Sequence, residues 1–162
     1  KEKFIKNCIE LGVDALIIVD LPPEEDDEFY FDAEKNNLSM IRLVTPTTDQ
    51  KRLKKILLNA TGFVYYVSIT GITGTQAPDI ENVQENIRKI KQVTDLPIVV
   101  GFGIRSPAQA TLMSEFSDGI VIGSAVVDLI KKTLDNDGDS SSGDLTSCLG
   151  FTKDISKALK HN

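Results

Sequence analysis

The residues best suited to chemistry in this sequence are two glycine-bearing turns, each placed between an apolar run and a helical pattern. They are Val99–Ile104 (VVGFGI) and Ile120–Ala125 (IVIGSA). Glycine lets a backbone approach a ligand closely, and the N–H groups and dipole of a following helix favour an anion. The two turns therefore predict a phosphate cup, with Ser124 as a hydroxyl donor and Phe102 as a flat apolar wall. The alternative is that these glycines only permit tight turns.

A long connection, Ser68–Pro78, is the second candidate for a functional segment, because it is rich in small residues and glycine. Connections in α/β units usually run two to six residues, and longer ones are often lids. Gly71 and Gly74 are the candidate hinges, and Thr73 is a candidate hydrogen-bond donor. The alternative is a surface insertion without function.

Acidic residues gather after the first apolar run, where Asp20 is followed by Glu24–Glu28. Consecutive acids point in different directions on a helix and favour its N-terminus, so we expect a solvated helix start here and no metal site. Asp20 stands at the end of a strand, where catalytic and binding groups gather in barrels, or it accepts local N–H groups in the following turn.

The amino-acid composition argues against several classes of function for this protein. The 162 residues carry a formal net charge of −6 without a Lys/Arg cluster, which disfavours nucleic acid as a partner. The only histidine is His161, next to the last residue, and this argues against His-centred catalysis. Cys8 and Cys148 stand far apart without metal-ligand spacing, so a reducing, cytoplasmic setting is expected. The longest apolar run is far shorter than the roughly 20 residues of a membrane span.

The elements that must position these residues alternate along the chain. Strands are predicted from nearly continuous apolar runs, expected to be buried on both faces of a parallel sheet, at Ala15–Val19, Met40–Val44, Phe63–Ser68, Pro97–Gly101 and Gly119–Ile122. Helices with one apolar face are predicted from the sets Phe4/Ile5/Cys8/Ile9, Leu53/Ile56/Leu57/Ala60, Val83/Ile87/Ile90 and Val126/Val127/Ile130/Leu134, with starts at Thr48–Asp49, Glu81–Asn82 and Ser106–Pro107.

This α(βα)5 order leaves an open doubly wound sheet or a barrel. A (β/α)8 barrel takes about 250 residues, so the chain holds about five of its eight units in that case. We divide the chain into 1–134 as a partial barrel, 135–150 as a polar surface loop, and 151–162 as a C-terminal helix of the same domain. Tyr65 and Tyr66 must face opposite sides of the third strand, where core packing explains both equally well.

Four motifs in order resemble the tryptophan synthase α subunit family over about Lys1–Lys132. The motifs are GVDALIIVDLP from Gly12, GFVYYVS with GITG from Gly62 and Gly71, GFGI from Gly101 and GSA from Gly123. The resemblance implies a (β/α)8 TIM barrel of which this chain covers about strands 4 to 8. It also implies a lyase of tryptophan biosynthesis, which splits indole-3-glycerol phosphate into indole and glyceraldehyde 3-phosphate by retro-aldol cleavage.

The resemblance carries over site residues as well. It implies that Gly74, Gly103, Gly123 and Ser124 hold the phosphate, that Phe102 and Tyr65 lie near the indole, and that Thr73 sits on a loop closing over the substrate. Asp20, Leu21 and Pro22 are expected to face a partner. That partner is a β subunit in an αββα heterotetramer, which holds pyridoxal phosphate, while this chain is expected to need no cofactor or metal of its own.

The sequence departs from the family in two ways. The general acid/base glutamate and its assisting aspartate belong to the second strand and the following loop, which have no counterpart here, and Asp20, Asp79 and Glu81 do not match those positions. The second departure is Ile69, where the family commonly has arginine. We therefore expect binding without catalysis from this chain alone. Two alternatives stay open: another phosphate-binding barrel of the phosphoribosyl isomerase or indole-3-glycerol phosphate synthase type, and a noncatalytic half-barrel that binds a partner.

Overall fold

Five parallel strands form one sheet, in the order in which they occur along the chain. The computed structural model describes residues 1–68, 80–101, 103–134 and 145–159. The strands are β1 (Ala15–Ile17), β2 (Ser39–Val44), β3 (Val64–Val67), β4 (Ile98–Gly101) and β5 (Gly119–Val121). The helices are α1 (Glu2–Glu10), α2 (Asp27–Lys35), α3 (Gln50–Leu57), α4 (Ile80–Lys91), α5 (Pro107–Ser114), α6 (Ser124–Lys131) and α7 (Thr146–Leu159).

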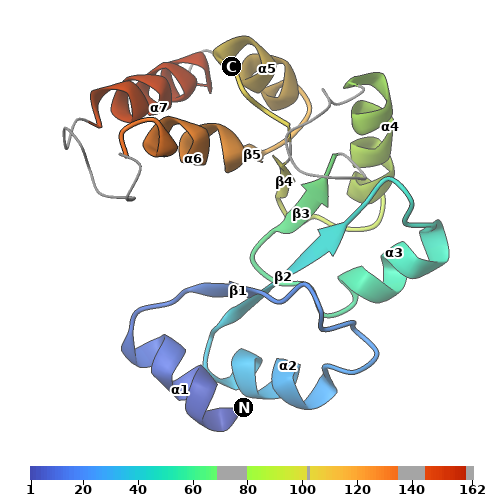
Figure 1. Cartoon of the computed structure of the whole chain (residues 1–162). Coiled ribbons are helices and arrows are strands. Elements are labelled where there is room, and N and C mark those ends of the chain that lie inside the picture. The colour runs from blue at the N-terminus through green and yellow to red at the C-terminus, as the bar shows by residue number, and fades with distance from the viewer. Residues whose placement is uncertain (69–79, 102, 135–144, 160–162) are drawn as a thin grey trace.

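The α(βα)5 order predicted from the sequence is confirmed, and every predicted strand lies within two residues of its predicted bounds. The sheet order also distinguishes the two architectures left open, because a doubly wound sheet reverses its strand order and this sheet does not. Figure 1 shows the strands along the inside of an arc and the helices around its outside. The chain thus forms a half-barrel.

Local capping explains where two of the helices begin. The Asp49 side chain accepts a hydrogen bond of 2.7 Å from the Arg52 N–H at the start of α3. Ser106 accepts one of 3.3 Å from the Gln109 N–H, with Pro107 at the first position of α5. Both starts are as predicted, because an N-cap oxygen satisfies a helix N–H that has no intrahelical partner.

The main core lies between the sheet and its outer layer of helices. Its centre consists of side chains with no exposed surface, which are Val64, Tyr66, Ile87, Ile98, Val100 and Ala110. The expectation that the strands are buried on both faces was wrong for the inner face. There Tyr65 is half-buried and Ile17 is 47% exposed, because the helices cover the outer face alone. As predicted, Tyr65 and Tyr66 face opposite sides of β3.

Helices near the two ends of the half-barrel bury less of their apolar faces than predicted. In α1, Ile5 and Cys8 are buried, whereas Phe4 is 51% exposed. In α6 only Ala125 is buried, and Val127 is 62% exposed. The reason is positional, since α6 follows the last strand of the sheet and α1 precedes the first.

The C-terminal part differs from the predicted division of the chain. Residues 146–150, expected to belong to a polar loop, form the first part of α7. This helix packs against α5 and α6 and buries Ile155. Among the described helices, none has the length and apolar character needed to cross a membrane.

The acidic segment after β1 contains a buried ion pair, which corrects the expectation of a fully solvated helix start. Asp26, at the start of α2, is completely buried, and its carboxylate pairs with the guanidinium of Arg42 from β2, itself 5% exposed. The Asp26 side chain makes no capping hydrogen bond with α2. The carboxylate therefore ties the β1–α2 connection to the sheet rather than to its own helix.

We expect Arg42→Met to lower the free energy of unfolding by about 3–5 kcal/mol, because it leaves a buried carboxylate unpaired. The double variant Asp26→Leu/Arg42→Met should recover most of that loss, since apolar side chains of similar volume replace a buried pair at little cost. Urea unfolding measures both effects.

The matched control is Glu85→Gln, which removes an exposed ion pair with Lys89 on α4 and should change stability by less than about 0.5 kcal/mol. A loss in Arg42→Met no larger than in this control would show that the buried pair does not hold the fold.

Candidate functional site

The two glycine turns lie side by side at the carboxyl edge of the sheet. Gly101 at the end of β4 pairs with Val121 at the end of β5. Gly103 and Gly123 each follow two residues later, on neighbouring parallel strands that point the same way. The register therefore brings the two bends to the same level of the half-barrel, as the phosphate hypothesis requires.

The first bend is fixed by its own backbone and by the start of α5. Gly103 is buried with a φ of +81°, a conformation that L side chains rarely adopt. The next residue, Ile104, is 2% exposed and anchors the bend in the core. The Arg105 N–H then donates a 2.8 Å hydrogen bond to Oε1 of Gln109 in α5.

The second bend is the N-terminus of α6. Gly123 precedes the helix, and its carbonyl accepts hydrogen bonds from the N–H groups of Val126 (3.0 Å) and Val127 (3.1 Å). The N–H groups of Ser124 and Ala125 begin the helix and so have no carbonyl of the preceding turn to bond. A Cβ added to Gly123 would meet nothing within 4 Å. This helix start is thus open to an anion, which the helix dipole favours.

Tyr65 on β3 lies directly against Gly101. A Cβ on Gly101 would come within 2.0 Å of the Tyr65 Oη and 2.4 Å of its Cζ, so only glycine leaves room for the ring. Burial raises the pKa of Tyr65, and the hydroxyl stays protonated at neutral pH. On the opposite face, burial raises the pKa of Tyr66 to about 12. A neutral phenol ring therefore borders the inner face beside the bends.

Ser68 joins the ends of β3 and β4. Its N–H and its Oγ both donate to the carbonyl of Gly101, at 3.1 Å and 2.8 Å. Ser68 is 7% exposed, so these bonds are shielded from water. The sequence prediction did not assign a role to Ser68, although a polar residue at the end of an apolar strand signals such a bond.

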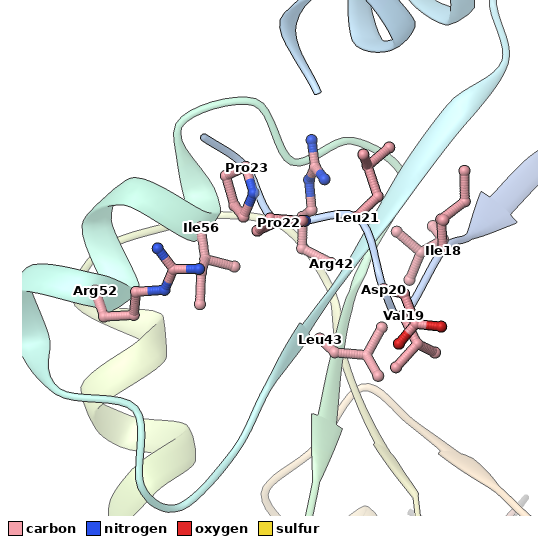
Figure 2. A pocket seen from close by; sticks show the side chains of 11 residues that line it. Ile18, Val19, Asp20, Leu21, Pro22, Pro23, Arg42, Leu43, Arg52 and Ile56 are labelled. Carbon is pink, nitrogen blue, oxygen red and sulfur yellow. The ribbon is translucent and has the colours of Figure 1, made fainter. Parts of the chain in front are cut away.

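The residues expected to face a partner lie elsewhere on the same edge. Asp20, Leu21 and Pro22 line a pocket of about 210 Å³ at the ends of β1 and β2. Figure 2 shows this pocket with two arginines, Arg42 from β2 and Arg52 from α3, among mostly apolar side chains. Since β1 and β5 lie at opposite ends of the sheet, Asp20 is not brought together with the glycine bends.

Two ion pairs hold the segment that forms this pocket. Of the arginines that line it, Arg42 pairs with Asp26 and Arg52 pairs with Glu24. Neither pair was predicted from the sequence. The signal was Arg42 itself, a charged residue within the apolar run of a strand, which has to find a buried partner.

Several residues named in the sequence analysis lie outside the described part of the chain. These are Ile69, Gly71, Thr73, Gly74, Asp79 and Phe102. Glu81 stands in the first turn of α4. Within the described ranges, no cluster of three or more His, Cys, Asp or Glu side chains is arranged to hold a metal ion.

Comparison with known proteins identifies the family. The model of the tryptophan synthase alpha chain family matches residues 1–155. The chain resembles the tryptophan synthase alpha subunit from Legionella pneumophila with 30% identity and a TM-score of 0.82, covering 99% of this chain and 57% of that one. The Campylobacter jejuni alpha subunit is 33% identical with a TM-score of 0.78, covering 95% and 58%.

A tryptophan synthase structure from Mycobacterium tuberculosis is 28% identical over 98% of this chain and 56% of that chain, with a TM-score of 0.84. This chain therefore spans a little more than half the length of the structures that it matches. The family match supports the hypothesis of a tryptophan synthase α subunit over the two alternatives, another phosphate-binding barrel and a noncatalytic half-barrel. With five parallel strands of a barrel and the motifs in order, the chain belongs to the tryptophan synthase alpha chain family.

Proposed function

We propose that this chain supplies the phosphate- and indole-binding part of a tryptophan synthase alpha subunit, the lyase that splits indole-3-glycerol phosphate into indole and glyceraldehyde 3-phosphate. The observation that carries the proposal is the pairing of Gly101 with Val121, which brings the bends at Gly103 and Gly123 to one level, with open space beside Gly123. A substrate anchored there by its phosphate extends its apolar part along the inner face.

The proposed roles follow from this placement. Gly103, Gly123 and Ser124 bind the phosphate through backbone N–H groups and the serine hydroxyl. Tyr65 borders the indole. By resemblance, Gly74 also contacts the phosphate, Phe102 packs against the indole, and Thr73 lies on a loop that closes over the substrate.

Catalysis needs a further group, because retro-aldol cleavage requires a carboxylate to move protons between the indole and the glyceryl hydroxyl. By resemblance, the glutamate and aspartate with this role lie in a part of the family that this chain does not match. We propose that the described half-barrel binds and orients the substrate, and that proton transfer depends on those two carboxylates.

The proposed partner is a tryptophan synthase β subunit, which carries pyridoxal phosphate, in an αββα assembly in the cytoplasm. The partner-facing segment is Asp20, Leu21 and Pro22. Support comes from its place at the ends of β1 and β2, where Asp20 is exposed and ion pairs of Asp26 and Glu24 hold the segment that follows. This chain itself is proposed to need no cofactor.

Indolepropanol phosphate should bind this chain, and Gly123→Glu should weaken its affinity by at least about tenfold, because the new carboxylate occupies open space meant for the phosphate. Gly103→Glu should also weaken it, because Gly103 is buried with a φ of +81° and any side chain there strains the first bend. Isothermal titration calorimetry measures the affinities. Indolepropanol, which lacks the phosphate, is the control ligand.

The matched control is Gly150→Glu, which adds the same charge at an exposed glycine of α7, where a Cβ also meets nothing within 4 Å. Equal affinities of the wild type, Gly123→Glu and Gly150→Glu would refute the phosphate assignment.

Gly101→Ala should displace the Tyr65 ring and cost about 1–3 kcal/mol of stability, because it overpacks a filled contact. Adding Tyr65→Ala should relieve the clash, while Gly123→Ala, which meets open space, should leave stability unchanged. Thermal unfolding of the three variants and the wild type tests this. If Gly101→Ala is as stable as Gly123→Ala, the contact does not constrain the site.

Indole production should be absent from the chain alone. It should appear when the chain is co-expressed with the part of the Legionella pneumophila alpha subunit that precedes the matched region. A general acid or base typically contributes about 10²–10⁴-fold, so the gain should be easily measured by indole assay. The control replaces the catalytic glutamate of the added segment by glutamine. Indole formation by the chain alone would contradict the proposed division of roles.

A further inference from the structure

An ion pair joins the segment after the first glycine bend to α6, the helix that follows the second bend. The guanidinium of Arg105, two residues after Gly103, pairs with the carboxylate of Asp128 in α6, 23 residues further along the chain. Arg105 belongs to the connection between β4 and α5, and Asp128 lies one helical turn beyond Ser124. The pair therefore joins the two segments that carry the bends.

Arg105 connects the ion pair to the backbone of the first bend, at Gly103. Its backbone N–H is fixed by Gln109, and the residue before it, Ile104, is buried in the core. Arg105 is also the only basic residue between Gly101 and Ile130, so Asp128 is paired with the sole cation of the segment that contains both bends. The backbone of the first bend and the side chain that reaches α6 thus form one continuous connection.

We propose that Arg105 and Asp128 are positioning residues, which set the separation of the two bends and so tune their affinity for a phosphate monoester. The inference rests on the proposed function and adds to it an ion pair that controls the geometry of the phosphate site. Backbone N–H groups bind an anion well only where their spacing matches its oxygens, and the register of β4 with β5 fixes that spacing only up to the ends of the strands. Beyond Gly101 and Val121, the ion pair between Arg105 and Asp128 sets the spacing of the two bends.

The alternative role for Arg105 is a direct contact with the phosphate. The two roles predict opposite effects on binding when Asp128 is removed. If Arg105 bound the phosphate, Asp128 would compete for the guanidinium, and its removal would strengthen binding. If the pair positions the bends, removal of either partner weakens binding. The guanidinium is paired with Asp128, which favours the positioning role.

The test compares four variants of the full chain: Arg105→Gln, Asp128→Asn, the double variant, and the charge exchange Arg105→Asp/Asp128→Arg. Isothermal titration at low ionic strength with indolepropanol phosphate, and with indolepropanol as the ligand without phosphate, provides the readout. Glu85→Gln, which breaks the exposed pair with Lys89 on α4, is the matched control.

We expect each single variant to weaken binding of indolepropanol phosphate about two- to fivefold, the range set by an exposed ion pair. The double variant should be no weaker than either single one, and the charge exchange should restore part of the affinity. Binding of indolepropanol and the urea midpoint should stay as in Glu85→Gln.

Tighter binding by Asp128→Asn, or unchanged binding by both single variants, would overturn the inference while leaving the proposed function intact. The failure of the proposed function looks different. In that case the wild type binds indolepropanol phosphate no better than indolepropanol, and the positioning role falls with it.

Discussion

Gly101 is the residue on which the geometry of the site depends. It pairs with Val67 of β3 on one side and with Val121 of β5 on the other. Its carbonyl accepts hydrogen bonds from the N–H and the Oγ of Ser68, and its missing side chain leaves the space that the Tyr65 ring fills. Three strands are thus aligned at one residue, and the level of both glycine bends follows from that alignment.

The two faces of the sheet differ in how deeply their side chains are buried. Outer-facing side chains of β3 and β4 are fully buried under helices, so they have no freedom to contact a ligand. Inner-facing side chains such as Tyr65 and Val99 are half-buried, and the Tyr65 ring packs against Gly101. The core therefore fixes the backbone from outside, while the inner side chains remain accessible.

Much of this arrangement follows from local sequence signals. Apolar runs locate the strands because buried parallel strands must be nearly continuous in apolar residues, and the glycine bends are visible because few other residues suit such turns. Asp49 and Ser106 were recognised as helix starts for the same reason, since a cap bonds to a residue only three positions away.

The features that the sequence did not reveal are pairings between distant residues. Asp26 stands among five acids and so resembles a solvated segment, and only the fold shows that Arg42 of the next strand reaches it. Arg105 and Asp128 pair across a helix and a strand. The exposed apolar face of α6 likewise depends on the position of its strand at the end of the sheet.

The fold is consistent with the proposed separation of substrate binding from proton transfer. Phosphate binding by backbone N–H groups needs only two correctly spaced bends, and the register between β4 and β5 is local to this half-barrel. Proton transfer needs carboxylates at a defined distance from a bound substrate, and such groups come from different strands of a barrel. In the proposed function, anchoring and orientation thus reside in a unit whose geometry is set by its own strand pairing. Chemistry at the other end of the substrate then depends on how accurately further strands are placed against its inner face.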